Sequence, residues 1–403
     1  MRVRYFGAGL YAMALVVMLA WRPTFASDLF SIVVSGSFSS VFASTQRGDR
    51  TASVIPDSLT QASLAAAFPG YFGFQQIDSQ FSLRGVQGTA SFAVGSTNLV
   101  VVIPGARINI TFFSGTAGRD TAVAQFRAWL LTQSGPLNDL LAQTAVRTTP
   151  TDPVAGNPGS LMGQMVAADY SRAMFAALGL GRGAGIGFGY SQFTARGGVT
   201  ARTSGVPINW TFELSPQDEL EVDGALSWTT TGGASAYGGH LGLLWRRQMS
   251  PNWTLQPALR VGVVNAPDFG ASSGLYQIGI TSTYRFALPW NMRMIVGNQI
   301  THANTYTVGF TDHGTNYAQT NTMFRNGIAI TRPLGFEALG EVLHGTFFVI
   351  DTRYIGDPVF IRNYQEIGAF VGAGANSRAQ AGVTFLTGDR GTRGFSLRAA
   401  WQF

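Results

Sequence analysis

The chain ends in the stretch GFSLRAAWQF, residues 394–403, in which apolar and polar residues alternate. One register holds Phe395, Leu397, Ala399, Trp401 and Phe403, and the other holds Ser396, Arg398, Ala400 and Gln402. A period of two is typical of a β-strand that has one apolar and one polar face. The stretch therefore predicts a terminal strand with Trp and Phe on one side and Arg and Gln on the other.

The same alternation recurs upstream, in the segments 208–215, 219–229, 253–263 and 276–286. Short turn sequences occur at 215–218, 250–253, 288–291, 332–335 and 374–378, and longer polar links lie between them. Short turns at one end and long loops at the other are typical of an antiparallel barrel in an outer membrane. Residues 183–403 are therefore predicted to form an all-β transmembrane barrel of about 12 strands, give or take about two.

The composition fits a chain in which apolar residues alternate with polar ones. Hydrophobic residues make up 46% of the 403 residues and charged residues only 12%, roughly half the charged share of soluble proteins. Beyond the N-terminus no run approaches the ~20 apolar residues of a membrane-spanning helix. Because cysteine is absent, disulfides and thiolate metal ligands are excluded. The net charge of +6 comes from scattered arginines without any lysine, which argues against a nucleic-acid partner.

Tryptophans gather at the predicted strand ends. Trp245, Trp253, Trp290 and Trp401 lie beside short turns or the C-terminus, and Trp228 lies beside a predicted outer loop. Indole rings favour the membrane interface, where the ring meets lipid and its N–H meets water. These five residues are predicted to form aromatic girdles. A soluble β-sandwich, the alternative for alternating strands, does not require aromatic residues at both strand ends.

Together, these patterns resemble Gram-negative outer-membrane β-barrel proteins over about half of the chain. The resemblance implies an outer-membrane location with lipids as partners. It also implies that the barrel-insertion machinery reads the terminal strand as an assembly signal. The residues that match this signal are Phe395, Leu397, Trp401 and Phe403.

Residues 1–26 have the organisation of a secretory signal peptide. Two early arginines precede an apolar run from about Gly7 to Trp21, and small residues surround Ala26. We expect cleavage after Ala26 and export from the cytoplasm. A retained membrane anchor is the alternative interpretation.

Residues 27–158 lack the regular alternation of strands and turns, and their pattern predicts a small α+β domain. Helical spacing occurs at 58–68, 121–133 and 135–146, and short strand patterns occur at 74–85, 88–95, 98–104 and 107–113. Residues 159–182 contain a further helical segment, 160–178, that leads into the barrel. The domain is interpreted as periplasmic, as a plug of the pore, or as a passenger.

These options give two main hypotheses for function. The first is a narrow pore for passive passage of small solutes through a charged lumen. The second follows from a resemblance to autotransporters, in which a passenger and a helix that threads the pore precede a twelve-stranded barrel. In that case the barrel is a translocator or anchor that displays residues 27–158.

The polar register of the strands predicts which charged side chains line the lumen. The expected pore-lining residues are Arg246, Arg260, Arg285, Arg293, Arg325, Glu221, Asp223, Glu341 and Glu366. A functional interpretation is a transverse field that selects solutes. A structural interpretation, slightly favoured, is that oppositely charged walls pair across the lumen and hold the barrel closed.

Catalytic and metal chemistry has weaker support in the sequence. Residues 270–274 match G-x-S-x-G, but a nucleophile elbow needs a strand before the serine and a helix after it, whereas this match falls in a predicted loop. Ser272 and Ser273 lie one hairpin from His302 and His313, which leaves an outer-membrane lipid hydrolase as a minor alternative. The four histidines lack metal-ligand spacing, so no cofactor, metal or catalytic residue is predicted.

Overall fold

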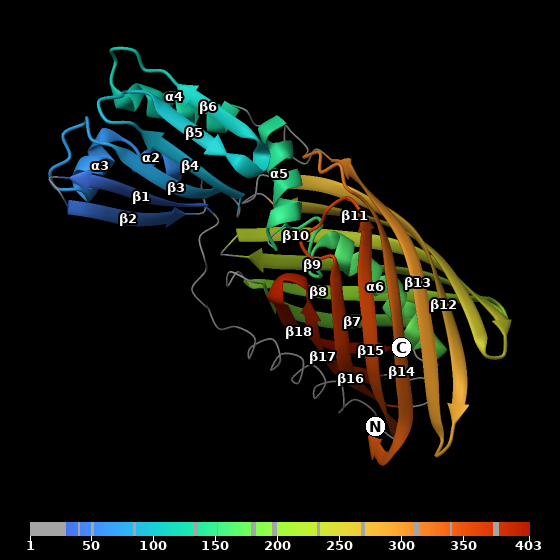
Figure 1. Ribbon diagram of the computed structural model, residues 1–403. Helices are drawn as coiled ribbons and strands as arrows, with labels where there is room; N and C mark the ends of the chain where they lie inside the picture. Colours follow the sequence, from blue (N-terminus) through green and yellow to red (C-terminus); the bar gives the residue numbers. More distant parts are fainter. Residues whose placement is uncertain are drawn as a thin grey trace, which may run out of the picture.

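The structure is a computed structural model that consists of an N-terminal α+β domain and a closed β-barrel (Figure 1). It describes residues 30–403 with gaps at 39–40, 50–51, 84–85, 133–135, 151, 179–182, 196–199, 232–233, 267–270, 309–314, 339–340 and 374–378. The expected signal peptide, residues 1–26, lies outside the described residues.

The N-terminal domain is one antiparallel six-stranded sheet with helices against it. Its strands follow the order β2-β1-β3-β4-β5-β6. They are β1 (Phe30–Phe38), β2 (Val41–Asp49), β3 (Ile77–Leu83), β4 (Val86–Phe92), β5 (Leu99–Ile103) and β6 (Ile108–Phe112). The helices are α2 (Val54–Ser58), α3 (Gln61–Ala67), the short η1 (Pro104–Ala106), α4 (Arg119–Thr132) and α5 (Pro136–Thr148). The four strand patterns correspond to β3–β6, whereas β1 and β2 were not anticipated from the sequence.

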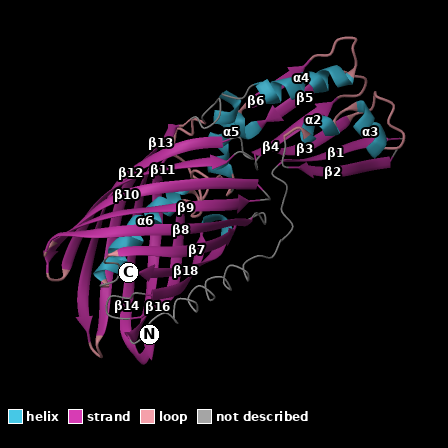
Figure 2. Ribbon diagram, turned by 180° about the vertical axis from the view of Figure 1, so that it is seen from behind, coloured by secondary structure: helices cyan, strands magenta, loops and turns pink. Residues whose placement is uncertain are grey.

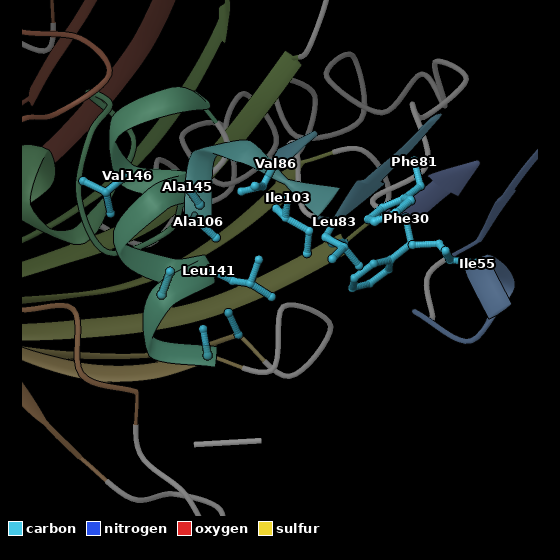
Figure 3. Packing of buried hydrophobic residues seen from close by; sticks show 14 of the residues in the cluster. Phe30, Ile55, Phe81, Leu83, Val86, Ile103, Ala106, Leu141, Ala145 and Val146 are labelled. Atoms are coloured by element: carbon cyan, nitrogen blue, oxygen red, sulfur yellow. The ribbon is translucent and has the colours of Figure 1, made fainter. Parts of the chain in front are cut away.

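The sheet buries one face because its strands alternate. In β3 and β4 every second residue is buried, as expected for a sheet with one face toward a core. Phe81 of β3 and Phe112 of β6 contact Phe126 of α4, with ring centroids 6.3 and 5.5 Å apart. Figure 3 shows Phe30, Ile55 and Phe81 in this core, and Leu141 and Val146 of α5 at its other end.

A buried arginine at the start of α4 joins two loops of the N-terminal domain. Arg119 is 1% exposed. It donates to the carbonyl oxygens of Ser96 (2.9 Å) and Ala93 (3.0 Å) and to the hydroxyl of Tyr71 (3.2 Å). Its guanidinium also lies 4.7 Å from the ring centroid of Phe92. The loops 71–76 and 93–98 are therefore tied to the first turn of α4.

Replacing Arg119 by methionine is expected to destabilise this domain by about 3 kcal/mol, because buried carbonyl groups lose charged donors. The readout is the urea concentration at which added protease cleaves the domain in the full chain. Arg127→Met is the matched control on the same helix, since Arg127 pairs with Asp57 at the surface and should cost less than about 1 kcal/mol. Equal effects of the two substitutions would contradict the assignment.

The C-terminal part is a closed barrel of twelve antiparallel strands, as predicted. Its strands are β7 (Ala184–Thr194), β8 (Thr200–Ser215), β9 (Asp218–Thr231), β10 (Ala234–Ser250), β11 (Trp253–Ala266), β12 (Ala271–Leu288), β13 (Met292–Thr307), β14 (Thr320–Ala338), β15 (Glu341–Gly356), β16 (Asn363–Ala373), β17 (Ala379–Gly388) and β18 (Thr392–Gln402). Each pairs with the next, and β18 pairs with β7, with Trp401 opposite Ile186. Beyond β18, the N–H of Phe403 donates to the carbonyl oxygen of Ala184 at 2.9 Å.

The outside of the barrel is apolar, as a membrane barrel requires. Leu226, Leu241, Ile278 and Phe385 are each at least 60% exposed on outward registers. The apolar residues of the terminal strand, including Phe395, Leu397 and Trp401, share the outward register. Within the described residues, no helix has the combined length and hydropathy needed to cross a bilayer.

The two ends of the barrel differ. One end, here called the short-turn end, carries the connections at 216–217, 251–252 and 289–291 and both ends of the barrel chain. The other, here called the long-loop end, carries the connections at 308–319 and 357–362, although Thr231 pairs directly with Ala234 there. Trp245, Trp253, Trp290 and Trp401 are exposed toward the short-turn end, and Trp228 is exposed toward the long-loop end.

One predicted turn is wrong. Residues 332–335 do not reverse the chain but lie within β14, which continues to Ala338. The pairing register shifts there between Pro333 and Glu337, and Gly335 adopts a positive φ of 77°. The β-bulge contains Pro and Gly, which are also typical of turns, and this explains why a turn was predicted here. The predicted turn at 374–378 lies outside the described residues.

Candidate functional site: the barrel lumen

Among the described residues, one helix, α6 (Leu161–Ala177), lies inside the barrel (Figure 2). The hydroxyl of Ser160 caps its start by accepting from the N–H of Gly163 at 3.4 Å. The helix contacts strands β10–β14. It begins near Phe193 and Thr203 at the long-loop end and finishes near the start of β7 at the short-turn end. The chain therefore passes through the lumen before it forms the barrel wall.

The strongest contact between α6 and the wall is a buried ion pair. The carboxylate of Asp169 accepts from Nε (3.0 Å) and Nη2 (2.7 Å) of Arg260 on β11, and from Nε2 of Gln277 (2.6 Å) on β12. Arg260 also donates to Asp223 (3.0 Å) and lies 2.8 Å from Nδ1 of His240. Asp169 and Arg260 side chains are 1% and 0% exposed, so neither charge is hydrated.

A second set of pairs lies one turn along the helix. Arg172 of α6 lies 3.2 Å from Glu221 and 3.7 Å from Asp223 on β9. Arg246 of β10 pairs with Glu219 and, at 2.9 Å, with Glu221. Residues 169 and 172 are three apart and so lie on one helix face. Opposite charges on that face match opposite charges on the wall, which fixes the rotation and height of the helix.

A third arginine of the wall stabilises the strands on the other side of α6. Arg325 of β14 donates to Thr352 (2.9 Å), to the hydroxyl of Tyr364 (3.0 Å) and to Glu366. Its guanidinium lies 5.3 Å from the ring centroid of Tyr170 on α6. Tyr170 also donates to the carbonyl oxygen of Gly297 at 3.1 Å.

The pattern of pairing differs from the expectation that charged walls pair across the lumen. Arg246 pairs within β9–β10, and Arg325 reaches only from β14 to β16. The physical reason is that α6 occupies the space between the walls and itself supplies the partners Asp169 and Arg172.

Three of the predicted pore-lining residues lie away from these pairs. Arg285 donates to the carbonyl oxygen of Pro251 (2.6 Å) in a turn at the short-turn end, and Arg293 is exposed at that same end. Glu341 is exposed and shares the outward register of Phe347 on β15. Its prediction as a lumen residue is wrong, because the predicted turn at 332–335 lies within β14 and the next strand begins only at Glu341, so the assumed phase does not hold.

The serines of the G-x-S-x-G match are at the start of a barrel strand. Ser272 and Ser273 of β12 donate to the carbonyl oxygens of Val308 (2.9 Å) and Tyr306 (3.1 Å). Nδ1 of His302 lies 3.0 Å from the hydroxyl of Thr322. Gly270 and His313 lie outside the described residues.

The long-loop end is covered by the N-terminal domain. The carbonyl oxygen of Val146, near the end of α5, accepts from the N–H of Phe360 in the β15–β16 loop at 2.7 Å, and Gly156 accepts from Ile361 at 3.0 Å. The carboxylate of Asp139 accepts from the N–H of Asn316 at 2.7 Å. These contacts continue the apolar core of the domain into the barrel loops.

Sequence reasoning did not identify Asp169, Tyr170 or Arg172 as functional residues. The available signal was an acid and an arginine three residues apart in an otherwise apolar helix. A pair of charges on an apolar face is expected to meet charged partners, since burial of an isolated charge is costly.

Known proteins similar to this chain are found among solved structures. No protein-family model matches the chain, and no curated protein matches its sequence. Among solved structures, the β-domain of the Bordetella autotransporter Brka is 18% identical, with a TM-score of 0.42, over 55% of this chain and 99% of that one. The translocator domain of autotransporter NalP from Neisseria meningitidis is 11% identical, with a TM-score of 0.44, over 60% and 96%. The KdgM porin is 6% identical, with a TM-score of 0.35, over 54% and 99%. Outer-membrane barrels of both the translocator and the porin type are thus among its structural neighbours.

Proposed function

We propose that the chain is an autotransporter-like anchor that holds residues 27–158 at the outer surface of the outer membrane. The observation that carries the proposal is the course of α6 through the lumen. The helix starts at the long-loop end, beneath the N-terminal domain, and leads to β7 at the short-turn end. Long loops of such barrels face outside and short turns face the periplasm.

The contacts of the lumen suit an anchor. Asp169, Tyr170 and Arg172 attach α6 to the wall, so the barrel holds the helix and the helix holds the domain. Attachment in this form needs neither a cofactor nor covalent chemistry. Export through a cleaved signal peptide and assembly by the insertion machinery belong to the same proposal.

Labelling of single cysteines tests the location of the domain, because the chain contains no cysteine. Val94→Cys lies on an exposed loop of the domain, and Asn252→Cys lies in an exposed turn at the short-turn end. On intact cells, a membrane-impermeant maleimide is expected to label the Val94→Cys variant fully. It should label the Asn252→Cys variant only after the outer membrane is permeabilised. The reverse pattern would place the domain in the periplasm and overturn the proposal.

A narrow pore for small solutes is the second candidate function. A cavity of about 310 Å³ beside α6 favours it. Planar-bilayer recordings separate the candidates: an anchor closed by α6 should conduct little, whereas a working pore should conduct with the helix in place.

A further inference from the structure

The helix α6 occupies only one side of the lumen. The helix lies close to the wall at Gly262, Gly297 and Gly327. A Cβ added at any of these glycines would lie 2.5–2.9 Å from Met165, Met174 or Tyr170 of the helix. The absence of side chains at these positions thus lets the helix lie close to strands β11, β13 and β14.

On its other side α6 leaves a cavity. The cavity of about 310 Å³ lies mainly between α6 and the wall formed by β16, β17, β18, β7 and β8, and residues of β9, β10, β14 and β15 also line it. Along the segment that contains α6, the lining extends from Pro158 to Leu178. Its volume is at the lower end of the ~300–1,000 Å³ range of small-molecule sites. A static plug does not require such a space.

Arg398 projects into this cavity from a row of glycines, and Arg172 and Arg325 also line it. Arg398 of β18 pairs directly with Gly382 of β17 and with Gly189 of β7, which in turn pairs with Gly205 of β8. Directly paired residues point to the same face of a sheet. The guanidinium is therefore flanked by positions without side chains. A Cβ added at Gly189 would have its nearest neighbour 4.0 Å away, at the carbonyl oxygen of Gly205.

Arg398 differs from the arginines that hold α6 and the wall together. Arg172, Arg246, Arg260 and Arg325 each pair with a carboxylate. The hydrogen bond found for Arg398 joins Nη1 to the hydroxyl of Ser171 at 3.1 Å, and no carboxylate among the described residues forms an ion pair with it. The side chain is exposed although it points into the lumen. Its remaining N–H groups are thus available to an anion in the cavity.

An aromatic surface lies within reach of this cation. Phe370 of β16 pairs with Gly382, so it stands in the same row as Arg398, two strands away. At ~4.8 Å per strand, the two backbones are roughly 10 Å apart. Phe370 contacts Phe175 of α6 and Phe348 of β15, with centroid distances of 5.3 and 6.3 Å. The cavity therefore offers a cation at Arg398 and an apolar surface around Phe370.

From this juxtaposition we infer that the cavity binds a single-chain carboxylate amphiphile, a medium-chain fatty acid. The carboxylate lies at Arg398, where the guanidinium can donate two parallel hydrogen bonds. The chain lies against Phe175, Phe348 and Phe370. A hydrophilic anion would leave the aromatic surface unused, and an uncharged apolar ligand would leave the guanidinium without a counter-ion. The inference is independent of the side of the membrane on which the N-terminal domain lies.

Titration of the full-length protein in a nonionic detergent with ¹³C-carboxyl decanoate tests the inference. Saturable binding is expected, with a carboxyl resonance distinct from that of decanoate in detergent alone. Arg398→Gln should weaken decanoate binding by about tenfold or more, because a charged hydrogen-bonding partner is lost. The same substitution should change the binding of ¹³C-labelled decanol by less than about twofold, because decanol carries no charge.

A second pair of variants tests whether the ligand occupies the cavity, without changing the charge at Arg398. Gly189→Leu places a side chain beside Arg398 and should abolish binding of both probes. Gly189→Ala adds one carbon in open space and should leave binding within about twofold of the unsubstituted protein. The heat-dependent shift in gel mobility reports an assembled barrel for each variant. Decanoate binding that is unchanged in both Arg398→Gln and Gly189→Leu would assign the probe to the outer, lipid-facing surface and overturn the inference.

Discussion

Replacing Asp169 by alanine is expected to release α6 from the barrel wall and to turn a closed lumen into a conducting one. The substitution removes the acceptor of three hydrogen bonds from Arg260 and Gln277. It also leaves Arg260, which is 0% exposed, with Asp223 as its remaining carboxylate. Breaking one side of a buried ion pair costs about 3–5 kcal/mol. Because Asp169 is on the helix and Arg260 is on the wall, this free energy comes from helix docking.

The measurement is single-channel conductance of the full chain in planar bilayers. The unsubstituted protein is expected to be mostly closed and Asp169→Ala mostly open. Asp169→Asn should lie between them, because the amide oxygen still accepts a hydrogen bond but carries no charge. Asp351→Ala is the matched control: it removes an exposed pair with Arg353, worth about 1 kcal/mol or less. Conductance equal to that of the unsubstituted protein in Asp169→Ala would refute the proposed role of the ion pair.

The barrel could be predicted from the sequence because its pattern is local. In β9, Leu220, Val222 and Trp228 alternate with Glu219, Glu221 and Asp223. The two sets lie on opposite faces of the strand in the structure, because successive strand residues point to opposite faces. The pattern depends on no partner strand. The same locality explains why Arg260, Asp223 and Glu366 were assigned to the lumen.

The pairing inside the lumen could not be predicted in this way. Asp169 and Arg260 are 91 residues apart, and their contact depends on the rotation of α6 and on the glycines that admit it. Glu341 was misplaced for a related reason. The predicted turn at 332–335 lies within β14, so the chain reverses later than expected, and an error of one residue in phase changes the face of every side chain that follows.

The other large effect concerns the barrel wall itself, where Arg325 connects three strands. Arg325 is 1% exposed and donates to Thr352 of β15 and to Tyr364 and Glu366 of β16. Arg325→Leu is expected to lower the free energy of barrel unfolding by about 3–5 kcal/mol, because Glu366 is left buried without its cation. The measurement is the temperature of the heat-dependent mobility shift, with unfolding in urea for the free energy.

A double substitution separates charge from packing at this site. When Arg325 and Glu366 are both replaced by leucine, most of the loss should be recovered, since a buried ion pair can be exchanged for apolar residues at little cost. Arg353→Leu, on the outward register of β15, is the control and should shift stability by less than about 1 kcal/mol. If the double variant were as unstable as Arg325→Leu alone, the Arg325 stem and its contact with Tyr170 would carry the stability. In that case the ion pair would be incidental to the wall.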